Sequence, residues 1–355
     1  MGRMHVLAAG AAAAVILGIG VGWMLISREP AASGPEAKAG ERELVTGTIA
    51  ARTSAAQLQA QPQPAPAPPF PAAPAMPQAK PAAAPSAPPA RVAASPRCEN
   101  PDPLGVSRTV AIDTAGGPGF GSEQFKAYDF LEPGEVVLTF DDGPWPNHTP
   151  AVLAALAAQC VKATFFPVGK HSSWHPEILK QVVARDHTVG SHTWSHVNLA
   201  KKSVQDAKDE IENGFSAVAV AAGRPLAPFF RFPGLSQTPE LTAYLAQRNI
   251  GIFSTDLDSF DFKLRNADKV ITSVMSKLDK RGKGIILMHD FQQSTAIALP
   301  TLLAQLKAKG FKIVHMKAKD TVTTLPQYDA AMVKAQAGQT SDARPTTSVV
   351  RTVAD

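Results

Sequence analysis

Short apolar runs alternate with amphipathic segments along the chain from residue 134 to about residue 317. The runs are rich in Val, Ile and Phe, which favour strands. We expect strands at 135–140, 162–168, 187–191, 228–232, 251–255, 284–289 and 311–316. The segments between them repeat apolar residues at helical spacing, which predicts helices at 149–159, 175–185, 203–222, 238–248, 267–281 and 295–310. Strands that are apolar on both faces and separated by helices indicate a parallel sheet.

This alternation predicts an α/β domain over residues 98–320. Seven expected strands in about 185 residues fall short of the roughly 250 residues of an eightfold barrel. A distorted (β/α)7 barrel therefore fits the pattern best. An open doubly wound sheet remains the alternative, although no Gly-rich dinucleotide motif supports it.

The chain opens on an apolar run, residues Val6–Ile26, that carries no charge. As a helix this run would span roughly 30 Å, the thickness of a bilayer core. We therefore expect a transmembrane helix within residues 1–28 that anchors the protein in the inner (cytoplasmic) membrane, with the domain in the periplasm. A signal peptide that is cleaved to release a secreted protein is the alternative.

Two segments lack the apolar content of a core. Residues 29–97 are rich in Pro and Ala, and proline removes backbone donors and fixes φ, so we expect a disordered, extended linker. Residues 321–355 are polar and poorly periodic, and we expect a disordered tail.

The net charge of +5 is spread along the chain, without the arginine-rich, aromatic-containing runs of nucleic-acid-binding proteins. We expect no nucleic-acid partner, and a monomer. The two cysteines, Cys98 and Cys160, are too few for a disulfide scaffold. In an oxidising compartment they could pair with each other, and two free thiols are the alternative.

Residues able to do chemistry follow the expected strands at their carboxyl ends, and they are Asp141, Asp142, His192, His196, Arg231, Asp256, Asp258, Asp261 and His289. Parallel strands bring these ends to one rim, where barrel enzymes place their active sites. Asp141 and Asp142 are adjacent, and both can serve one site only where the strand ends, which Gly143 and Pro144 ensure.

His192 and His196 are spaced so that one helical turn would place both imidazoles on the same face. With Asp142 they make a three-ligand set that leaves an open position, as catalytic zinc requires. Non-haem iron(II) oxygenases use the same ligands, and two surface histidines on a loop would need no metal at all. The other histidines lack this spacing, and we expect them to be surface or structurally satisfied residues.

The stretches TFDDGP, SHTWSH, RFPG, DSFDF and LMH occur in this order between residues 139 and 289. They resemble the five motifs of the polysaccharide deacetylases, carbohydrate esterase family 4, over roughly residues 134–317. The resemblance implies a distorted (β/α) barrel, with Asp142, His192 and His196 as metal ligands and Asp141 as the general base. It further implies that Arg231 orients Asp141, that His289 is the general acid beside Asp261, that Gly234 stabilises the oxyanion and that Leu287 receives the acetyl methyl group.

The activity implied by the resemblance is metal-dependent removal of N-acetyl groups from glycans that contain N-acetylglucosamine. The expected metal is Zn²⁺, with Co²⁺ or Ni²⁺ as alternatives. Two positions depart from the family pattern, because Gly234 and Phe262 stand where many members carry Tyr and Trp. An O-acetyl (xylan-type) esterase remains an alternative, because the same oxyanion chemistry serves both bonds, and a catalytically inactive glycan-binding member is a second alternative.

Overall fold

The structure is a computed structural model, and it describes residues 98–337 and 344–350. The transmembrane helix expected within residues 1–28 and the linker expected at residues 29–97 lie outside the described residues. Among the helices of the described ranges, none is both long and apolar enough to cross a membrane.

All seven expected strands are present, several of them shorter than the apolar run that predicted them. The strands of the described part are β1 (Arg108–Ile112), β2 (Gly119–Phe120), β3 (Glu135–Asp141), β4 (Thr164–Phe166), β5 (Thr188–Val189), β6 (Phe229–Phe230), β7 (Gly251–Phe253), β8 (Leu257–Asp258), β9 (Gly284–His289) and β10 (Lys312–Ala318).

Helices follow most of these strands. The α-helices of the described part are α1 (His148–Ala158), α2 (Gly169–Trp174), α3 (Pro176–Ala184), α4 (Val204–Ala222), α5 (Pro239–Gln247), α6 (Asp261–Leu264), α7 (Ala267–Arg281), α8 (Gln293–Ala308) and α9 (Pro326–Ala337). Short 3-10 turns are present at Leu199–Lys201 and Pro233–Leu235.

All pairings between the described strands are parallel, which confirms the predicted α/β class with a parallel sheet. The central strand is β3, which pairs along one edge with β9 and along the other with β10 and then β4. From β4 the sheet continues to β5, and a single bridge between Ser191 and Phe230 connects it to β6 and β7. Strand β8 then pairs with β9. The carboxyl ends of these strands consequently face the same way.

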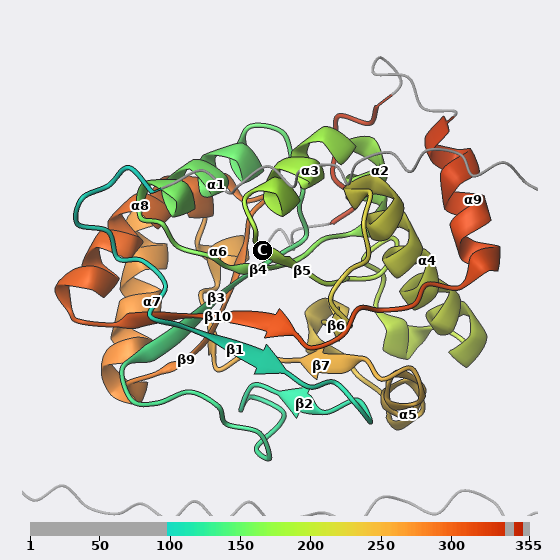
Figure 1. The fold of residues 1–355 in the computed structure, drawn as a ribbon, viewed down its shortest axis with the longest axis horizontal. Coiled ribbons are helices and arrows are strands. Elements are labelled where there is room, and N and C mark those ends of the chain that lie inside the picture. Colours follow the sequence, from blue (N-terminus) through green and yellow to red (C-terminus); the bar gives the residue numbers. More distant parts are fainter. Residues whose placement is uncertain (1–97, 338–343, 351–355) are drawn as a thin grey trace, which may run out of the picture. The chain divides into compact units, whose positions relative to one another are not determined.

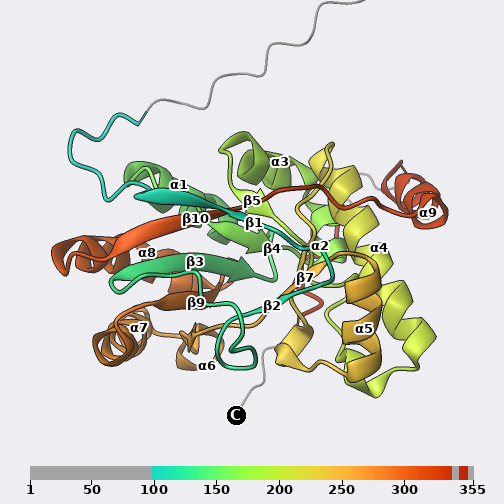
Figure 2. The same cartoon turned by 60° about the horizontal axis from the view of Figure 1, so that its bottom comes forward.

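Helices lie around the strands, as Figures 1 and 2 show from two directions. All seven residues of β3 are buried, because helices and neighbouring strands cover it on every side. The helix ends follow local chemistry. The Ser203 hydroxyl caps α4 at its start by accepting the N–H of Asp206, and Gly223 ends the helix in the left-handed conformation.

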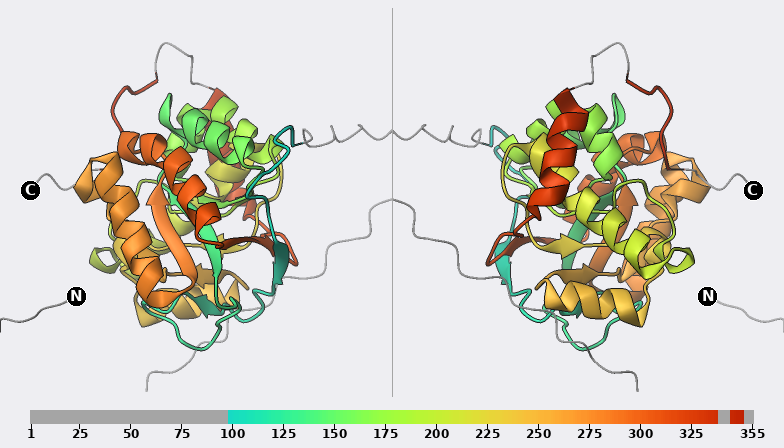
Figure 3. Two further views of the ribbon diagram at one scale, coloured as in Figure 1. Left: turned by 90° about the vertical axis from the view of Figure 1, so that its left-hand side faces the viewer. Right: turned by 90° about the vertical axis from the view of Figure 1, so that its right-hand side faces the viewer.

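The expectation of a disordered tail at residues 321–355 is wrong for the part that forms a helix in the structure. Residues Pro326–Ala337 form α9, which packs against α4 and is visible at the edge of the domain in Figure 3. The Tyr328 hydroxyl donates to Asp209 of α4 over 2.6 Å. Strands β1, β2 and β8 and helices α2 and α6 were also not predicted. All five have six residues or fewer, and β1 and β2 lie ahead of residue 134, where the predicted alternation begins.

Cys98 and Cys160 are joined by a disulfide, with their Cα atoms 5.6 Å apart. Cys98 is the first described residue, and Cys160 follows the end of α1. The bond therefore fixes the start of the described domain to the helix that follows β3.

Candidate metal centre and active site

The site begins where β3 ends. Asp141 is the last residue of the strand, and Asp142 has a φ of 75°, in the left-handed region that turns the chain out of the sheet. Both side chains are almost completely buried, each with an exposed fraction of 2%. The change of direction at Asp142 lets two adjacent carboxylates face one site, as the sequence predicted.

The two histidines of the HxxxH stretch do not lie on a helix, and that expectation is wrong. Residues 192–196 form a loop in which Thr193 and His196 have φ values of 67° and 57°. The carboxylate of Glu210 on α4 holds this loop by accepting the N–H and the hydroxyl of Ser195, at 2.9 and 2.7 Å. The loop still brings the rings of His192 and His196 together, with centroids 4.9 Å apart.

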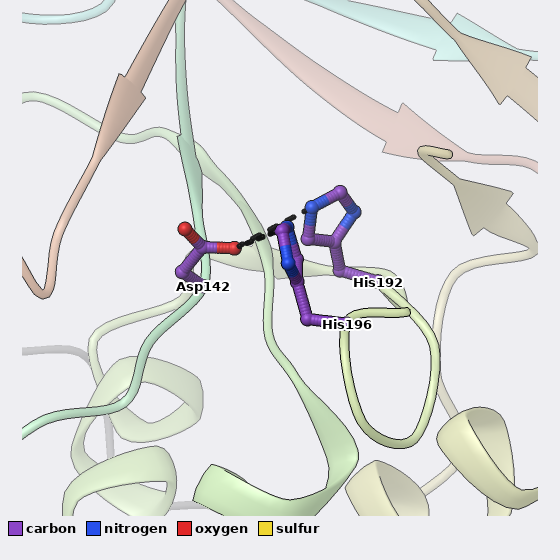
Figure 4. Close-up of side chains that lie close together, drawn as sticks. All are labelled: Asp142, His192 and His196. Atoms are coloured by element: carbon purple, nitrogen blue, oxygen red, sulfur yellow. Dashed lines mark ion pairs between the residues drawn. The ribbon is translucent and has the colours of Figure 1, made fainter. Parts of the chain in front are cut away.

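Asp142, His192 and His196 point toward one another, as Figure 4 shows. Their candidate ligand atoms all lie within 4.8 Å of one another. Oδ1 of Asp142 is 3.5 Å from Nε2 of His192 and 3.3 Å from Nε2 of His196. A carboxylate and two imidazoles at this separation can converge on a single cation.

The protonation of His192 and the unpaired oxygen of Asp142 favour a bound cation. Nδ1 of His192 donates to the carbonyl oxygen of Arg231 over 2.7 Å, which leaves the lone pair of Nε2 directed toward Asp142. Burial lowers the pKa of His192 to about 4, so the ring is neutral at neutral pH. Oδ1 of Asp142 is buried and has no hydrogen-bond partner in the described part of the chain. Lone pairs facing one another without a proton between them repel, and a divalent metal would remove that repulsion. The residues present therefore fit a metal.

Asp141 is paired differently from its neighbour. Its Oδ1 lies 2.7 Å from Nη1 of Arg231, a residue with an exposed fraction of 0%. Arg231 also donates to the hydroxyl of Thr139 and to the carbonyl oxygens of Phe253 and Ser254. With these partners the guanidinium has one fixed position, and it holds the carboxylate of Asp141 at the edge of the metal centre.

His289, the last residue of β9, is held by Asp261. Nδ1 of His289 donates to Oδ1 of Asp261 over 2.6 Å, and the backbone N–H of His289 donates to Oδ2 over 2.7 Å. The hydroxyl of Thr295 also donates to Asp261. Asp256 and Asp258 have other hydrogen-bond partners, Asp256 with Ser122 and Arg281, and Asp258 with the N–H of Phe260. Asp261 is therefore the acidic residue that orients His289.

Neighbouring charges raise the pKa of His289 and lower the pKa of Asp142. Burial works to lower the pKa of His289, but Asp261, Asp142 and Asp141 outweigh it and raise the pKa to about 10. Burial likewise works to raise the pKa of Asp142, and the nearby His196, His289 and His192 leave it below the ordinary aspartate value. At neutral pH, His289 therefore carries a proton that it can give up, while Asp142 is a carboxylate able to bind a metal.

One pocket of about 290 Å³ collects these groups. It is lined by Asp141, Asp142, His192, His196, Phe232, Gly234, Leu235, Asp258, Phe262, Leu287, His289, Phe291 and Val350. Gly234, with a φ of 58°, and Leu287 both lie in the lining, whereas Arg231 and Asp261 stand behind it and contact Asp141 and His289.

Two residues near the site, Asp290 and His171, were not identified as site residues from the sequence. Asp290 accepts the N–H of Gly143 over 3.0 Å and the hydroxyl of Thr149 over 2.6 Å, so it fixes the turn that carries Asp142. Its place directly after the strand-end His289 was the signal for it. Nδ1 of His171 lies 2.6 Å from the carbonyl oxygen of Asp142, and no spacing in the sequence marked this contact.

Comparison with known proteins points to one family. Residues 131–252 match the family model described as polysaccharide deacetylase. The chain is 33% identical over 198 residues to a peptidoglycan-N-acetylglucosamine deacetylase of Bacillus cereus, covering 54% of this chain and 70% of that protein. It is 30% identical over 192 residues to a chitooligosaccharide deacetylase of Bradyrhizobium sp., covering 50% of this chain and 87% of that protein.

Other relatives are longer than the matched region. The peptidoglycan-N-acetylglucosamine deacetylase PgdA of Listeria monocytogenes is 35% identical over 182 residues, which is 50% of this chain but only 37% of that protein. The solved structure of the Bdellovibrio bacteriovorus peptidoglycan deacetylase Bd3279 superposes with a TM-score of 0.55 at 32% identity, covering 60% of this chain and 59% of that one. Together with the site geometry, these matches show that the chain belongs to the polysaccharide deacetylase family.

Proposed function

We propose that this protein is a metal-dependent hydrolase that removes N-acetyl groups from glycans containing N-acetylglucosamine. The observation that carries the proposal is the convergence on one pocket of three metal-binding side chains, an Arg-paired carboxylate and a carboxylate-paired histidine. The relatives that are named as deacetylases of peptidoglycan and of chitooligosaccharides support the choice of substrate.

Asp142, His192 and His196 would hold the metal, which we propose to be Zn²⁺, with Co²⁺ or Ni²⁺ as alternatives. When bound, such a cation lowers the pKa of a coordinated water and polarises the acetyl carbonyl group. The ligand set of one carboxylate and two imidazoles leaves a coordination position open for substrate.

In the proposed mechanism, two residues transfer the protons. Asp141 accepts a proton from the attacking water, and Arg231 holds the carboxylate in place and balances its charge. His289 donates its proton to the nitrogen of the acetamido group as the C–N bond breaks, which releases acetate and leaves the free amine on the sugar.

Two lining residues would position the acetyl group. The backbone N–H of Gly234 is the proposed donor to the carbonyl oxygen as negative charge develops there. Leu287, an apolar residue of the same lining, is the proposed contact for the acetyl methyl group.

We further interpret the succession of strands from β3 to β9 and back to β3 as a distorted (β/α)7 barrel. The pairs β3–β4, β4–β5, β6–β7, β8–β9 and β9–β3 and the Ser191–Phe230 bridge support this interpretation. We also propose that the domain lies outside the cytoplasm, in the periplasm, anchored in the inner membrane. The Cys98–Cys160 disulfide supports export, because such bonds persist in oxidising compartments.

The test is acetate release by the purified full chain from peptidoglycan, chitooligosaccharides and acetylated xylan, with metal content measured on the same preparation. We expect release from one or both of the N-acetylated substrates. Release from acetylated xylan alone would identify an O-acetyl esterase. Glycan binding by metal-loaded protein without any acetate release would identify an inactive binding protein.

A matched pair of variants separates the general base from the metal ligands. The Asp141→Asn variant should still bind the metal. Its rate of acetate release should be lower by about 10²–10⁴-fold, the usual contribution of a general base. Asp279→Asn, at an exposed aspartate that pairs with Lys309, should behave as the wild type. Full activity of the Asp141→Asn variant would contradict the mechanism.

A further inference from the structure

One residue of the pocket lining comes from a distant part of the chain. The other lining residues fall between Asp141 and Phe291, whereas Val350 lies in the segment 344–350 that follows α9. The motifs of the sequence analysis did not include this segment. The segment nevertheless contributes Val350 to the same pocket as Asp142 and His196.

Contacts at both ends hold the segment 344–350 against the domain. Nη1 of Arg344 lies 2.9 Å from Oε1 of Glu177, near the start of α3. The backbone N–H of Val349 donates to Nε2 of His171 over 3.1 Å, and the hydroxyl of Ser348 lies at the same distance from this nitrogen. The N–H of Val350 in turn donates to the Ser348 hydroxyl over 2.9 Å.

His171 connects this segment to the metal centre. Because Nε2 accepts the N–H of Val349, Nδ1 carries the ring proton and donates it to the carbonyl oxygen of Asp142. The ring is completely buried and packs against Trp145 and Trp174, with centroid distances of 5.0 and 5.5 Å. The imidazole therefore has one orientation, and through it the backbone of Val349, next to the lining residue Val350, is linked to the backbone carbonyl of Asp142.

The pocket lacks a side chain at one position of its lining, Gly234. Gly234 offers no side chain, and a Cβ built there would meet only the Ser236 hydroxyl, at 3.8 Å. This leaves open space beside Gly234, whereas Val350 brings a branched apolar residue to another position of the same lining. A polymeric glycan can extend past the reacting sugar only where the lining leaves room.

From these contacts we propose that Val350, held by the docking of Ser348 and Val349 on His171, is a specificity-determining residue. Its side chain limits how far the glycan extends at its position of the lining, and it thereby selects substrates by chain length. This inference rests on the proposed function, because it assigns a substrate preference to the same site. Val350 takes no part in the proton transfers.

The first test compares Val350→Ala with Val333→Ala in the full chain. Val333 is an exposed valine on α9, with 54% of its surface accessible, and serves as the matched control. We expect Val350→Ala to raise the ratio of kcat/KM for chitohexaose over chitobiose by about 10-fold, the lower range for a change of pocket size by a methylene group or two. Val333→Ala should leave that ratio unchanged.

The second test removes the hydrogen bond between Val349 and His171 and keeps residue 350 as valine. Val349→Pro deletes the N–H that His171 accepts, whereas Val349→Ala keeps it. We expect Val349→Pro to shift the length preference in the same direction as Val350→Ala, and Val349→Ala to leave it as in the wild type. Titration calorimetry of chitooligosaccharides on metal-free protein should show the same shift in relative affinities, which makes the result independent of turnover.

An unchanged length preference in both Val350→Ala and Val349→Pro would overturn the proposal. An equal gain for all chain lengths would also overturn it, because the segment would then obstruct the pocket without selecting among substrates. These outcomes differ from a failure of the proposed function, in which the wild type itself would release no acetate from any of the glycans.

Discussion

The carboxylate of Asp141 and the guanidinium of Arg231 form a buried ion pair, with 2.7 Å between Oδ1 and Nη1. The exposed fractions of the two residues are 2% and 0%. Removing one partner of such a pair leaves an uncompensated charge in the interior, which costs more than the pair itself contributes. The same ion pair therefore contributes to the stability of the fold and holds Asp141 in position in the site.

We expect Arg231→Leu to lower the free energy of unfolding by about 3–5 kcal/mol, because Asp141 would remain charged and buried without its partner. Urea unfolding followed by circular dichroism measures this change. Arg224→Leu, at an exposed arginine, should stay within about 0.5 kcal/mol of the wild type. Equal stability of the two variants would argue against a structural role for the ion pair.

The metal-binding hypothesis predicts that His196→Ala loses bound metal. Loss of an outer hydrogen-bond partner already weakens metal binding by about 10–100-fold, and loss of a ligand should cost at least as much. Metal content after dialysis, measured by mass spectrometry, checks this. His148→Ala is the control, because Nδ1 of His148 bonds to the carbonyl oxygen of Phe291 away from the three ligands. Equal metal content in both variants would refute the assignment.

Asp261 should set the alkaline limit of activity. Its charge helps to raise the pKa of His289 to about 10, and the proton on His289 is the one donated to the leaving amine. Asp261→Asn removes that charge, so the alkaline limb of the kcat/KM profile should move to lower pH. Asp258→Asn should move it much less, since Asp258 bonds to the N–H of Phe260. A limb that does not move in Asp261→Asn would exclude His289 as the acid.

Because histidines such as His187 are buried away from the site, we expect the stability of the fold to decrease at acidic pH. Burial lowers the pKa of His187 to about 3, below the roughly 6.5 of an unfolded chain. Between these values the unfolded state binds the extra proton, so stability is present above about pH 6.5 and is lost as the pH falls. Each pH unit in that window costs about 1.4 kcal/mol per such histidine.

Urea unfolding at pH 7.5 and pH 5.0 tests this expectation. The wild type should lose stability between the two conditions, and His187→Gln should lose less, because Gln does not titrate. His315, whose pKa burial lowers to about 4, contributes to both proteins alike and cancels in the comparison. An identical pH dependence of the two proteins would show that His187 does not contribute.

The sequence predicted the parts of this structure that depend on apolar runs. The stretch from Glu135 to Phe140 is uninterrupted by charge after its first residue, and it forms the central strand with the carboxylates at its end. The residues that converge at the pocket follow from the same principle, since parallel strands align their carboxyl ends.

The spacing and periodicity of the sequence were misleading where tertiary contacts determine the conformation. The spacing of His192 and His196 fits a helical turn, but Glu210 holds the segment as a loop through Ser195. Strand β1 lies ahead of residue 134, outside the region of alternating apolar runs, and α9 has little apolar periodicity, so neither was predicted. The contact of Val349 with His171 spans 178 positions, and local pattern carries no information about it.

The disulfide between Cys98 and Cys160 also determines where mechanical load enters the domain. Strand β1 lies between the two cysteines, inside the loop that the bond closes. Tension applied to the chain ahead of residue 98 would pass through a covalent link to the end of α1, and it would bypass the hydrogen bonds that join β1 to β10. The sheet edge would then not be unzipped by a pull from that direction.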